Sequence, residues 1–375
     1  MIIGSILEDK NFEQRIAITP DVVKKYKSLG LNICITKNYG LHLGYKDDEF
    51  LKEGAEITEN NEAVISKSDI LVQLNLCDDQ NLEKLRENQS IIGILNPYSN
   101  ESKLKKLSLK KINCFSLELL PRITRAQSMD ILSSQANLAG YKAVIDSFAY
   151  FQKAIPMMMT AAGTISAAKV LVVGAGVAGL QAIATAKRLG AVVSATDVRS
   201  ATKEQVESLG GKFIMVEDEE SKNAETEGGY AKEMSDEYKK KQAQLIAETV
   251  AKQDIVICTA LIPGKKAPVL ITEEMVSSMI PGSVVIDLAV EAGGNCPLSK
   301  MNEIITHNGV KIVGYGNVPG RVAKDASALY SKNIFNFLSL LVDKENKKIN
   351  FDLEDEITNS VLLTHNGEVR LEQFK

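Results

Sequence analysis

The chain has 375 residues, which is enough for two domains of ordinary size, each with its own hydrophobic core. Hydrophobic residues make up 45% of the sequence and charged residues 25%, and the net charge is −4, a profile that excludes a basic surface made for nucleic acid. Five widely spaced cysteines and three histidines form no metal-ligand motif, which predicts reduced thiols and no metal site.

The N-terminus and the hydropathy pattern predict no targeting or membrane segment. A short apolar run at residues 2–7 is followed at once by charged residues, which is not the pattern of a signal peptide. No apolar run approaches the roughly 18 to 20 residues needed to cross a bilayer, and the longest candidate, residues 334–342, fits the buried face of a helix. We therefore expect no direct membrane insertion, and any association with a membrane would come through a partner.

Strand and helix signals alternate along the first 120 residues. Alternation of this kind packs as a parallel sheet with helices on both faces. The first helix is marked by Thr19-Pro20 at its start and by Gly30 at its end. The predicted strands are residues 2–7, 32–36, 70–74, 90–95 and 112–117, and the predicted helices are residues 20–30, 47–54, 82–89 and 103–110.

A polar segment that starts at Arg122 leads into a helical pattern over residues 126–152, which is too long for a linker. Gln127, Asp130 and Ser134 share one face if this segment is helical. With Arg122 beside it, such a face could hold the carboxamide and ribose of a nicotinamide in a cleft between domains. Ser, Thr and Asp near the start of a helix also act as caps, and the spacing alone favours that second interpretation.

The most informative stretch is a dinucleotide-binding pattern that begins with an apolar strand at residues 170–173. It continues with three spaced glycines, an Ala-rich helix and a second strand. Gly174 permits the tight turn, Gly176 lets the backbone approach a pyrophosphate, and Gly179 lets helix and strand pack closely. Three glycines alone are a weak signal, but strand, helix and second strand together make this a specific one.

The helix that follows the glycines is the expected phosphate site. Its first turn contains Val177 and Ala178, where unpaired N–H groups and the helix dipole favour negative charge. Asp197 ends the second strand 18 residues after the last glycine, where this motif places its ribose-binding carboxylate. A carboxylate accepts from a 2′-hydroxyl and repels a 2′-phosphate, so the motif favours NAD over NADP. Arg199, which follows Val198, could accommodate the extra phosphate.

Ligands of open parallel sheets bind outside the carboxyl ends of the strands, at a topological switch point. Loops that follow predicted strands in the second sheet therefore supply three further candidates, Ala260, Leu261 and Asn317. The glycines and prolines of these loops suit the close approach of a nucleotide, and they suit ordinary turns as well. The strands are predicted at residues 212–216, 254–259, 283–288 and 310–313, and the loops at residues 260–264, 289–295 and 315–319.

Residues 217–241 interrupt the pattern with a charged stretch that contains Gly229 and Tyr230. The segment predicts a mobile surface loop that runs into a helix. A charge run often means only a solvated surface. A loop of this length in a compact domain is often a lid or a binding loop, so both interpretations stay open.

The C-terminal region combines a second long helix, residues 322–341, with short β-like segments over residues 349–371. His365-Asn366-Gly367 predicts a tight hairpin turn, and a two-stranded tail needs the first domain to lean on. The sequence therefore predicts an α/β fold with two doubly wound parallel-sheet (Rossmann-like) domains joined by two long helices. The predicted N-terminal domain is 1–130 plus 330–375, and the predicted NAD(H)-binding domain is 131–329.

Several segments, taken together, closely resemble the NAD(H)-binding component, domain I, of proton-translocating NAD(P) transhydrogenase. The resemblance implies that the loop with Arg122, Gln127 and Asp130 lies against the nicotinamide and faces the NADP(H)-binding domain. It also implies that Ser133 contacts the carboxamide, and that Tyr230 belongs to a mobile loop that closes over NAD(H). The likeness covers nearly the whole chain and is carried by residues 122–142, 174–190, 202–206, 228–234, 259–264 and 293–296.

The same resemblance implies the cofactors and partners. NAD(H) would bind this chain, NADP(H) would bind a partner subunit, and hydride would pass directly between NADH and NADP+. The chain ends at Lys375 without membrane helices, which resembles the arrangement in which domain I is a separate α1-type subunit. Such a subunit would be cytoplasmic, a homodimer, and held at the inner membrane by partner subunits.

Alanine dehydrogenase is the alternative, because it shares the two-domain fold and the opening pattern found here at residues 13–20. Interconverting an amine and a ketone requires a proton-transferring group. Alanine dehydrogenases place a Lys and a His in stretches that correspond here to residues 71–77 and 93–97, and neither stretch contains such a residue. Arg15 is retained, and without those partners we expect it to pack structurally. A non-catalytic NAD sensor is the third possibility.

Overall fold

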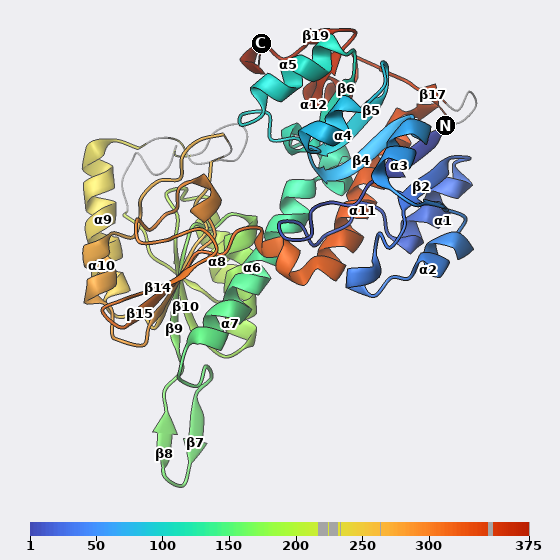
Figure 1. Ribbon diagram of the computed structural model, residues 1–375. Coiled ribbons are helices and arrows are strands. Elements are labelled where there is room, and N and C mark those ends of the chain that lie inside the picture. Colours follow the sequence, from blue (N-terminus) through green and yellow to red (C-terminus); the bar gives the residue numbers. More distant parts are fainter. Residues whose placement is uncertain (217–223, 225–231, 233, 263, 344–347, 375) are drawn as a thin grey trace. The chain divides into compact units, whose positions relative to one another are not determined.

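The computed structural model describes the chain apart from residues 217–223, 225–231, 233, 263, 344–347 and 375 (Figure 1). The chain divides into two compact units, which we call unit 1 (Met1–Gln135 and Gly320–Lys375) and unit 2 (Ala136–Pro319). Each unit is built on a mostly parallel sheet with helices, which confirms the predicted α/β class with two parallel-sheet domains. That two long helices join the domains stays a prediction.

The described residues of unit 1 form an eight-stranded sheet in the order β19-β18-β6-β5-β4-β1-β2-β3. Strands β1 to β6 are parallel, and their apolar side chains are buried because helices cover the sheet. The strands are β1 (Ile2–Ser5), β2 (Asn32–Thr36), β3 (Glu56–Thr58), β4 (Ile70–Asn75), β5 (Ser90–Ile94), β6 (Asn113–Ser116), β18 (Leu362–His365) and β19 (Glu368–Val369). The helices are α1 (Pro20–Ser28), α2 (Asp47–Lys52), α3 (Asn61–Lys67), α4 (Asp79–Glu83), α5 (Glu101–Leu109), α11 (Ala323–Leu341) and α12 (Glu356–Val361).

Three elements of unit 1 were not predicted, and one was misplaced. Helix α12 lies within residues 349–371, so the prediction of only β-like segments there is wrong; Asp355 caps this helix by accepting from the N–H of Ile357 at 2.9 Å. Strand β3 and helix α3 lie where no element was expected, although Asn60 caps α3 by accepting from the N–H of Ala63 at 2.9 Å. The helix predicted over residues 82–89 corresponds to α4, which starts earlier because Asp78 accepts from the N–H of Asn81 at 2.8 Å. The errors in the helices come from overlooked Asn and Asp caps.

The C-terminal tail completes the sheet of unit 1. The predicted hairpin turn is confirmed: β18 and β19 pair antiparallel, and Asn366 and Gly367 both have positive φ, at 50° and 88°. Strand β18 also pairs with β6, where the Thr364 hydroxyl accepts from the N–H of Cys114 (3.1 Å) and donates to the carbonyl of Ile112 (2.7 Å). The tail therefore belongs to unit 1.

Unit 2 contains a seven-stranded sheet in the order β11-β10-β9-β12-β13-β15-β14 among its described residues. The chain runs from β9 outward through β10 to β11, and then returns to β12 on the other side of β9. The topological switch point therefore lies between β9 and β12, where ligands of such sheets bind. The strands are β9 (Lys169–Val173), β10 (Val192–Thr196), β11 (Lys212–Phe213), β12 (Ile255–Cys258), β13 (Val284–Asp287), β14 (Ile304–His307) and β15 (Val310–Val313).

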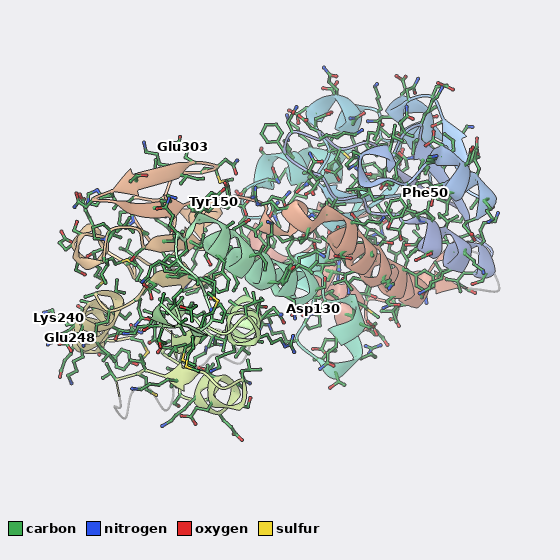
Figure 2. The ribbon with its side chains drawn as sticks, turned by 90° about the horizontal axis from the view of Figure 1, so that it is seen from below. Phe50, Asp130, Tyr150, Lys240, Glu248 and Glu303 are labelled. Carbon is green, nitrogen blue, oxygen red and sulfur yellow. The ribbon has the colours of Figure 1, made fainter. Side chains whose placement is uncertain are left out.

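The remaining helices are α6 (Ile131–Tyr150), α7 (Val177–Arg188), α8 (Thr202–Ser208), α9 (Asp236–Val250) and α10 (Glu273–Ser278). Helix α6 ends at Tyr150, whose hydroxyl is hydrogen-bonded to that of Tyr315 in the loop after β15 (Figure 2). Strand β14 was not predicted and forms an antiparallel edge beside β15. No helix in the described ranges is both long enough and apolar enough to span a membrane.

A second unpredicted feature is a hairpin that projects from unit 2 (Figure 1). It consists of β7 (Met158–Thr160) and β8 (Gly163–Ile165), which pair only with each other. Its apolar side chains are exposed, including 61% of Met157 and 79% of Met159. An isolated two-stranded sheet is only marginally stable in water.

Candidate nucleotide-binding site

The loop between β9 and α7 is built around three glycines with different constraints. A Cβ on Gly174, whose φ is 101°, would lie 2.7 Å from Oγ1 of Thr259. A Cβ on Gly179 would lie 1.9 Å from the carbonyl oxygen of Gly174. A Cβ on Gly176 would meet no atom within 4 Å. Two glycines therefore allow the close packing of the loop, and the third leaves open space beside the backbone, a cradle that fits a pyrophosphate.

The first turn of α7 faces this open space. Gly176 caps the helix with an extended backbone, and its carbonyl accepts from the N–H of Leu180 at 2.8 Å. The N–H groups of the first turn, which includes Val177 and Ala178, have no acceptor within the helix, so they and the helix dipole favour an anion. The turn is held by Gly140 of α6, where a Cβ would lie only 2.1 Å from the carbonyl oxygen of Ala178. Gly140 was not among the predicted site residues.

Asp197 follows β10 and is tied to the glycine loop. Its Oδ2 accepts from the N–H of Ala175 at 2.7 Å, and its Oδ1 accepts from the N–H of Arg199 at 2.9 Å. The Arg199 guanidinium pairs with the same carboxylate, with Nε 2.9 Å from Oδ1 and Nη2 2.8 Å from Oδ2. Val198, between them, packs against the buried cluster of Ala224, Met234 and Tyr238.

The loop after β12 is held by a side chain that was not among the predicted site residues. Asn295 is fully buried, and its Nδ2 donates to the carbonyls of Ala260 (2.9 Å) and Pro268 (2.8 Å). Its Oδ1 accepts from the N–H of Ala260 at 3.1 Å. These bonds fix the backbone of Ala260, while the neighbouring Leu261 is exposed. Asn317, after β15, has a φ of 43°.

Asp287, at the end of β13, organises the neighbouring loop in the same way. Its carboxylate is fully buried and accepts from the N–H groups of Ala289 and Cys296, both at 3.0 Å, and from the Ser299 hydroxyl at 2.7 Å. A Cβ on Gly294 would lie 2.8 Å from this carboxylate, so the loop closes tightly around it. Asn295 and Asp287, like Gly140, were not among the predicted site residues. Asp287 lies near the end of a predicted strand, and Asn295 lies in the predicted loop 289–295.

The segment expected at the nicotinamide lies in unit 1 and differs from its predicted form. Residues Thr124–Met129 form a 3-10 helix, and α6 starts only at Ile131, so the prediction that Gln127, Asp130 and Ser134 share one α-helical face is wrong. A 3-10 turn has three residues per turn rather than 3.6, which changes the register before α6. Gln127 therefore precedes the helix on which Ser134 lies.

Asp130 acts as a helix cap, as the spacing alone had favoured. Its Oδ1 accepts from the N–H of Ser133 at 2.8 Å, and its Oδ2 accepts from the Ser133 hydroxyl (Figure 2). Arg122 and Gln127 are exposed to solvent. Roles for these four residues at a nicotinamide stay a prediction, and Gly229 and Tyr230 lie outside the described residues.

A buried polar cluster lies at the carboxyl ends of β1 and β4 in unit 1. The Arg15 guanidinium donates from Nη2 and Nε to Glu13 at 2.7 and 2.8 Å, and from Nη1 to Gln135 at 2.8 Å. Asn75 donates to Glu13 and to Glu8, both at 3.2 Å. Arg15 is thus bound by groups of the protein itself, in agreement with the expectation that it packs structurally.

Burial raises the pKa of Glu8 from its ordinary value of 4.5 to about 7, and the neighbouring Glu13 carboxylate contributes to this rise. Hydrogen bonds from the N–H groups of Leu74 (2.7 Å) and Asn75 (3.2 Å) act in the opposite direction. In the loop after β5, the N–H of Asn96 donates to Glu118 at 2.6 Å, and burial raises the pKa of Glu118 as well. Residues 71–77 and 93–97, the stretches where alanine dehydrogenases place a Lys and a His, thus contain neither residue.

Comparison with protein families covers almost the whole chain. Residues 5–139 match "Alanine dehydrogenase/PNT, N-terminal domain" and residues 143–372 match "Alanine dehydrogenase/PNT, C-terminal domain". The chain belongs to the alanine dehydrogenase/PNT family. It is 54% identical to a chain of Rhodospirillum rubrum named as the first portion of NAD(P) transhydrogenase subunit alpha, over 95% of this chain and 94% of the relative. The relative of the same name from Rickettsia prowazekii is 45% identical over 98% and 96% of the two chains.

Solved structures within the family agree with the sequence relatives. The transhydrogenase from Sinorhizobium meliloti is 48% identical, matches over 98% of this chain and 100% of its own, and superposes with a TM-score of 0.89. An L-alanine dehydrogenase structure has a TM-score of 0.82 at 19% identity, which shows the shared fold alone. The alanine dehydrogenase of Methanococcus maripaludis is 27% identical over 99% of this chain and 95% of its own. The predicted likeness to transhydrogenase is confirmed, with alanine dehydrogenases more distant.

Two glycine substitutions should separate folding from ligand binding. Gly179→Ala should lower the free energy of unfolding by about 2 kcal/mol or more, because its methyl group meets a backbone carbonyl that cannot move freely. Gly176→Ala should leave stability within about 0.5 kcal/mol of the parent protein. It should nevertheless weaken dinucleotide binding about tenfold or more, because its methyl group fills the cradle. Denaturant unfolding measures the stability of both variants, and titration calorimetry measures their dinucleotide binding. Equal losses of stability in the two variants would contradict the assignment of Gly176.

Glu8 should make stability depend on pH. Its pKa is raised on folding, so between pH 4.5 and about 7 the folded state holds a proton that the unfolded state has released. The free energy of unfolding should therefore fall as pH rises through this window, by up to about 3 kcal/mol. Glu8→Gln should remove this contribution to the slope in denaturant unfolding. Glu101→Gln, at an exposed carboxylate, is the matched control and should keep the parent slope.

Proposed function

We propose that this chain is the NAD(H)-binding subunit of a proton-translocating transhydrogenase, which passes hydride directly between NADH bound here and NADP+ bound on a partner subunit. The observation that carries the proposal is an open glycine cradle combined with the lack of a Lys or His in residues 71–77 and 93–97, the stretches where alanine dehydrogenases place them. The 54% identity to a protein named as a transhydrogenase alpha subunit supports the same assignment.

The residues of unit 2 fit a bound dinucleotide. Gly174, Gly176 and Gly179 shape the cradle, and Asp197 presents a carboxylate beside it for a ribose hydroxyl. The fixed backbone of Ala260 and the exposed Leu261 lie after β12, beside the switch point of the sheet. The nicotinamide supplies the hydride when it is bound, and the residues of this chain bind and orient it. NAD(H) is favoured over NADP(H) because Asp197 would repel a 2′-phosphate.

Arg122, Gln127, Asp130 and Ser133 are assigned to the nicotinamide end by resemblance to the family. Hydride transfer from one nicotinamide ring to another forms no new O–H or N–H bond, so the chemistry needs no general acid or base. What the proteins contribute is proximity, with reacting atoms roughly 3 to 3.5 Å apart, and the exclusion of water. Gly229 and Tyr230 would serve that exclusion within a closing loop.

The partners follow from the same proposal. An NADP(H)-binding domain and membrane subunits would complete the enzyme, and proton translocation would occur in those partners. The chain would then be a cytoplasmic subunit held at the inner membrane by them. Two relatives are each named as one portion of a subunit alpha, which supports an assembly of several subunits.

A mixing experiment tests the function. The purified chain, combined with an NADP(H)-binding partner, should catalyse cyclic hydride exchange between NADH and NADP+, which is followed by absorbance of a nicotinamide analogue. Gln127→Asn should slow this exchange and leave NADH affinity nearly unchanged. Gln80→Asn, at an exposed position of α4, is the matched control and should behave as the parent protein. Alanine-dependent reduction of NAD+ by the chain alone would instead establish the alanine dehydrogenase alternative, and the absence of both activities would favour an NAD sensor.

We also propose that the chain forms a homodimer that covers the β7–β8 hairpin. The hairpin exposes apolar side chains and has no other strand to pair with among the described residues, which supports a second copy as its cover. Met159→Asp should convert the dimer to a monomer in sedimentation analysis, because a charge would be buried at the contact. Leu109→Asp, on α5 at 82% exposure, is the control and should stay dimeric. A Met159→Asp dimer of parent affinity would exclude the hairpin as the contact.

A further inference from the structure

The carboxylate of Asp197, to which we assign ribose binding, is already fully engaged within the chain. A carboxylate accepts about four hydrogen bonds, two on each oxygen. Oδ1 accepts from the backbone N–H and the Nε of Arg199, and Oδ2 accepts from the N–H of Ala175 and the Nη2 of Arg199, at distances between 2.7 and 2.9 Å. A ribose hydroxyl therefore finds no vacant position on this carboxylate until one of these four donors leaves.

Two of the four donors belong to the backbone and two to a side chain. The N–H groups of Ala175 and Arg199 belong to backbone that is fixed by the glycine loop and by the turn after β10. The other two donors come from the Arg199 side chain, which has four rotatable bonds and retains 13% exposure, against 7% for Asp197. The bidentate guanidinium is therefore the group that a ribose would replace, because the two backbone bonds hold the loop without it.

We propose that Arg199 is a specificity-determining residue that competes with the nucleotide ribose for Asp197. The inference rests on the proposed function, namely that NAD(H) binds this loop. Competition weakens NADH binding, because each binding event must break the Asp197–Arg199 pair. It acts in the opposite direction on NADPH, because the guanidinium neutralises Asp197 and gives a 2′-phosphate a cation to bind. Asp197 thus sets the preference for NADH, and Arg199 limits how strong that preference is.

Equilibrium titration with NADH and with NADPH tests the proposal on the full chain. Arg199→Gln should bind NADH about three- to tenfold more tightly than the parent protein and should bind NADPH more weakly. The dissociation constant for NADPH divided by that for NADH should therefore rise at least about tenfold. Arg199→Lys keeps the positive charge but cannot form the bidentate pair. Its ratio of dissociation constants should lie between that of the parent protein and that of Arg199→Gln. Arg188→Gln, an exposed arginine at the end of α7, controls for the change in net charge and should leave the ratio unchanged.

The outcomes separate this inference from the proposed function. A parent protein that binds no NADH would overturn the proposed function itself. If the parent binds NADH and Asp197→Asn weakens that binding, but Arg199→Gln leaves the ratio unchanged or weakens NADH, the competition is refuted and the function stands. If Arg199→Gln does not fold, Arg199→Lys decides by the same titrations. A crystal structure with NADH would support the proposal if Arg199 has turned away from Asp197, and would overturn it if the bidentate pair persists.

Discussion

The candidate nucleotide site depends on the close packing of Gly179 against the carbonyl oxygen of Gly174. There is no room for a side chain at Gly179 in this contact. This approach sets the start of α7 directly against the ends of β9 and β12. The Thr259 hydroxyl then reaches the Gly174 carbonyl at 2.9 Å, and Asp197 reaches the N–H of Ala175. Three neighbouring strands thereby hold one loop in a single conformation, and the open side of that loop, at Gly176, is what remains for a ligand. The open space at Gly176 is thus a consequence of how the loop packs.

The sequence predicted the elements of the fold that depend on local patterns. Apolar runs located the buried parallel strands, glycine spacing located the nucleotide loop, and Asn366-Gly367 located the terminal hairpin, since each of these needs only neighbouring residues. The roles of Asn295 and Asp287 could not be predicted, because their partners are backbone groups brought near by the fold. The hairpin of β7 and β8 was missed because its strands are short and have no alternating polar face.

The buried cluster of unit 1 shows why a shared fold does not decide the chemistry. Arg15 is buried with a full charge, and breaking such a pair by removing one partner costs about 3 to 5 kcal/mol. Glu13 and Gln135 therefore have a structural role whether or not a substrate ever binds beside them. The Asn75 amide donates to both Glu13 and Glu8 and completes this cluster. An arginine shared with the opening pattern of alanine dehydrogenases can thus be held by the protein alone.

A subunit that only positions a hydride donor gains nothing from binding it too tightly. Interactions that stabilise the bound nucleotide and the transition state equally do not raise the catalytic rate once the site is occupied. The oxidised and reduced forms must also exchange in every turnover, which a very slow dissociation would limit. In the function proposed above, a side chain that competes for the carboxylate of Asp197 would moderate affinity without touching the reacting ring, because Asp197 and Arg199 lie beside the glycine loop, to which Asp197 bonds. The pair would therefore tune binding and selectivity, and the geometry of the proposed hydride transfer would be left to other residues.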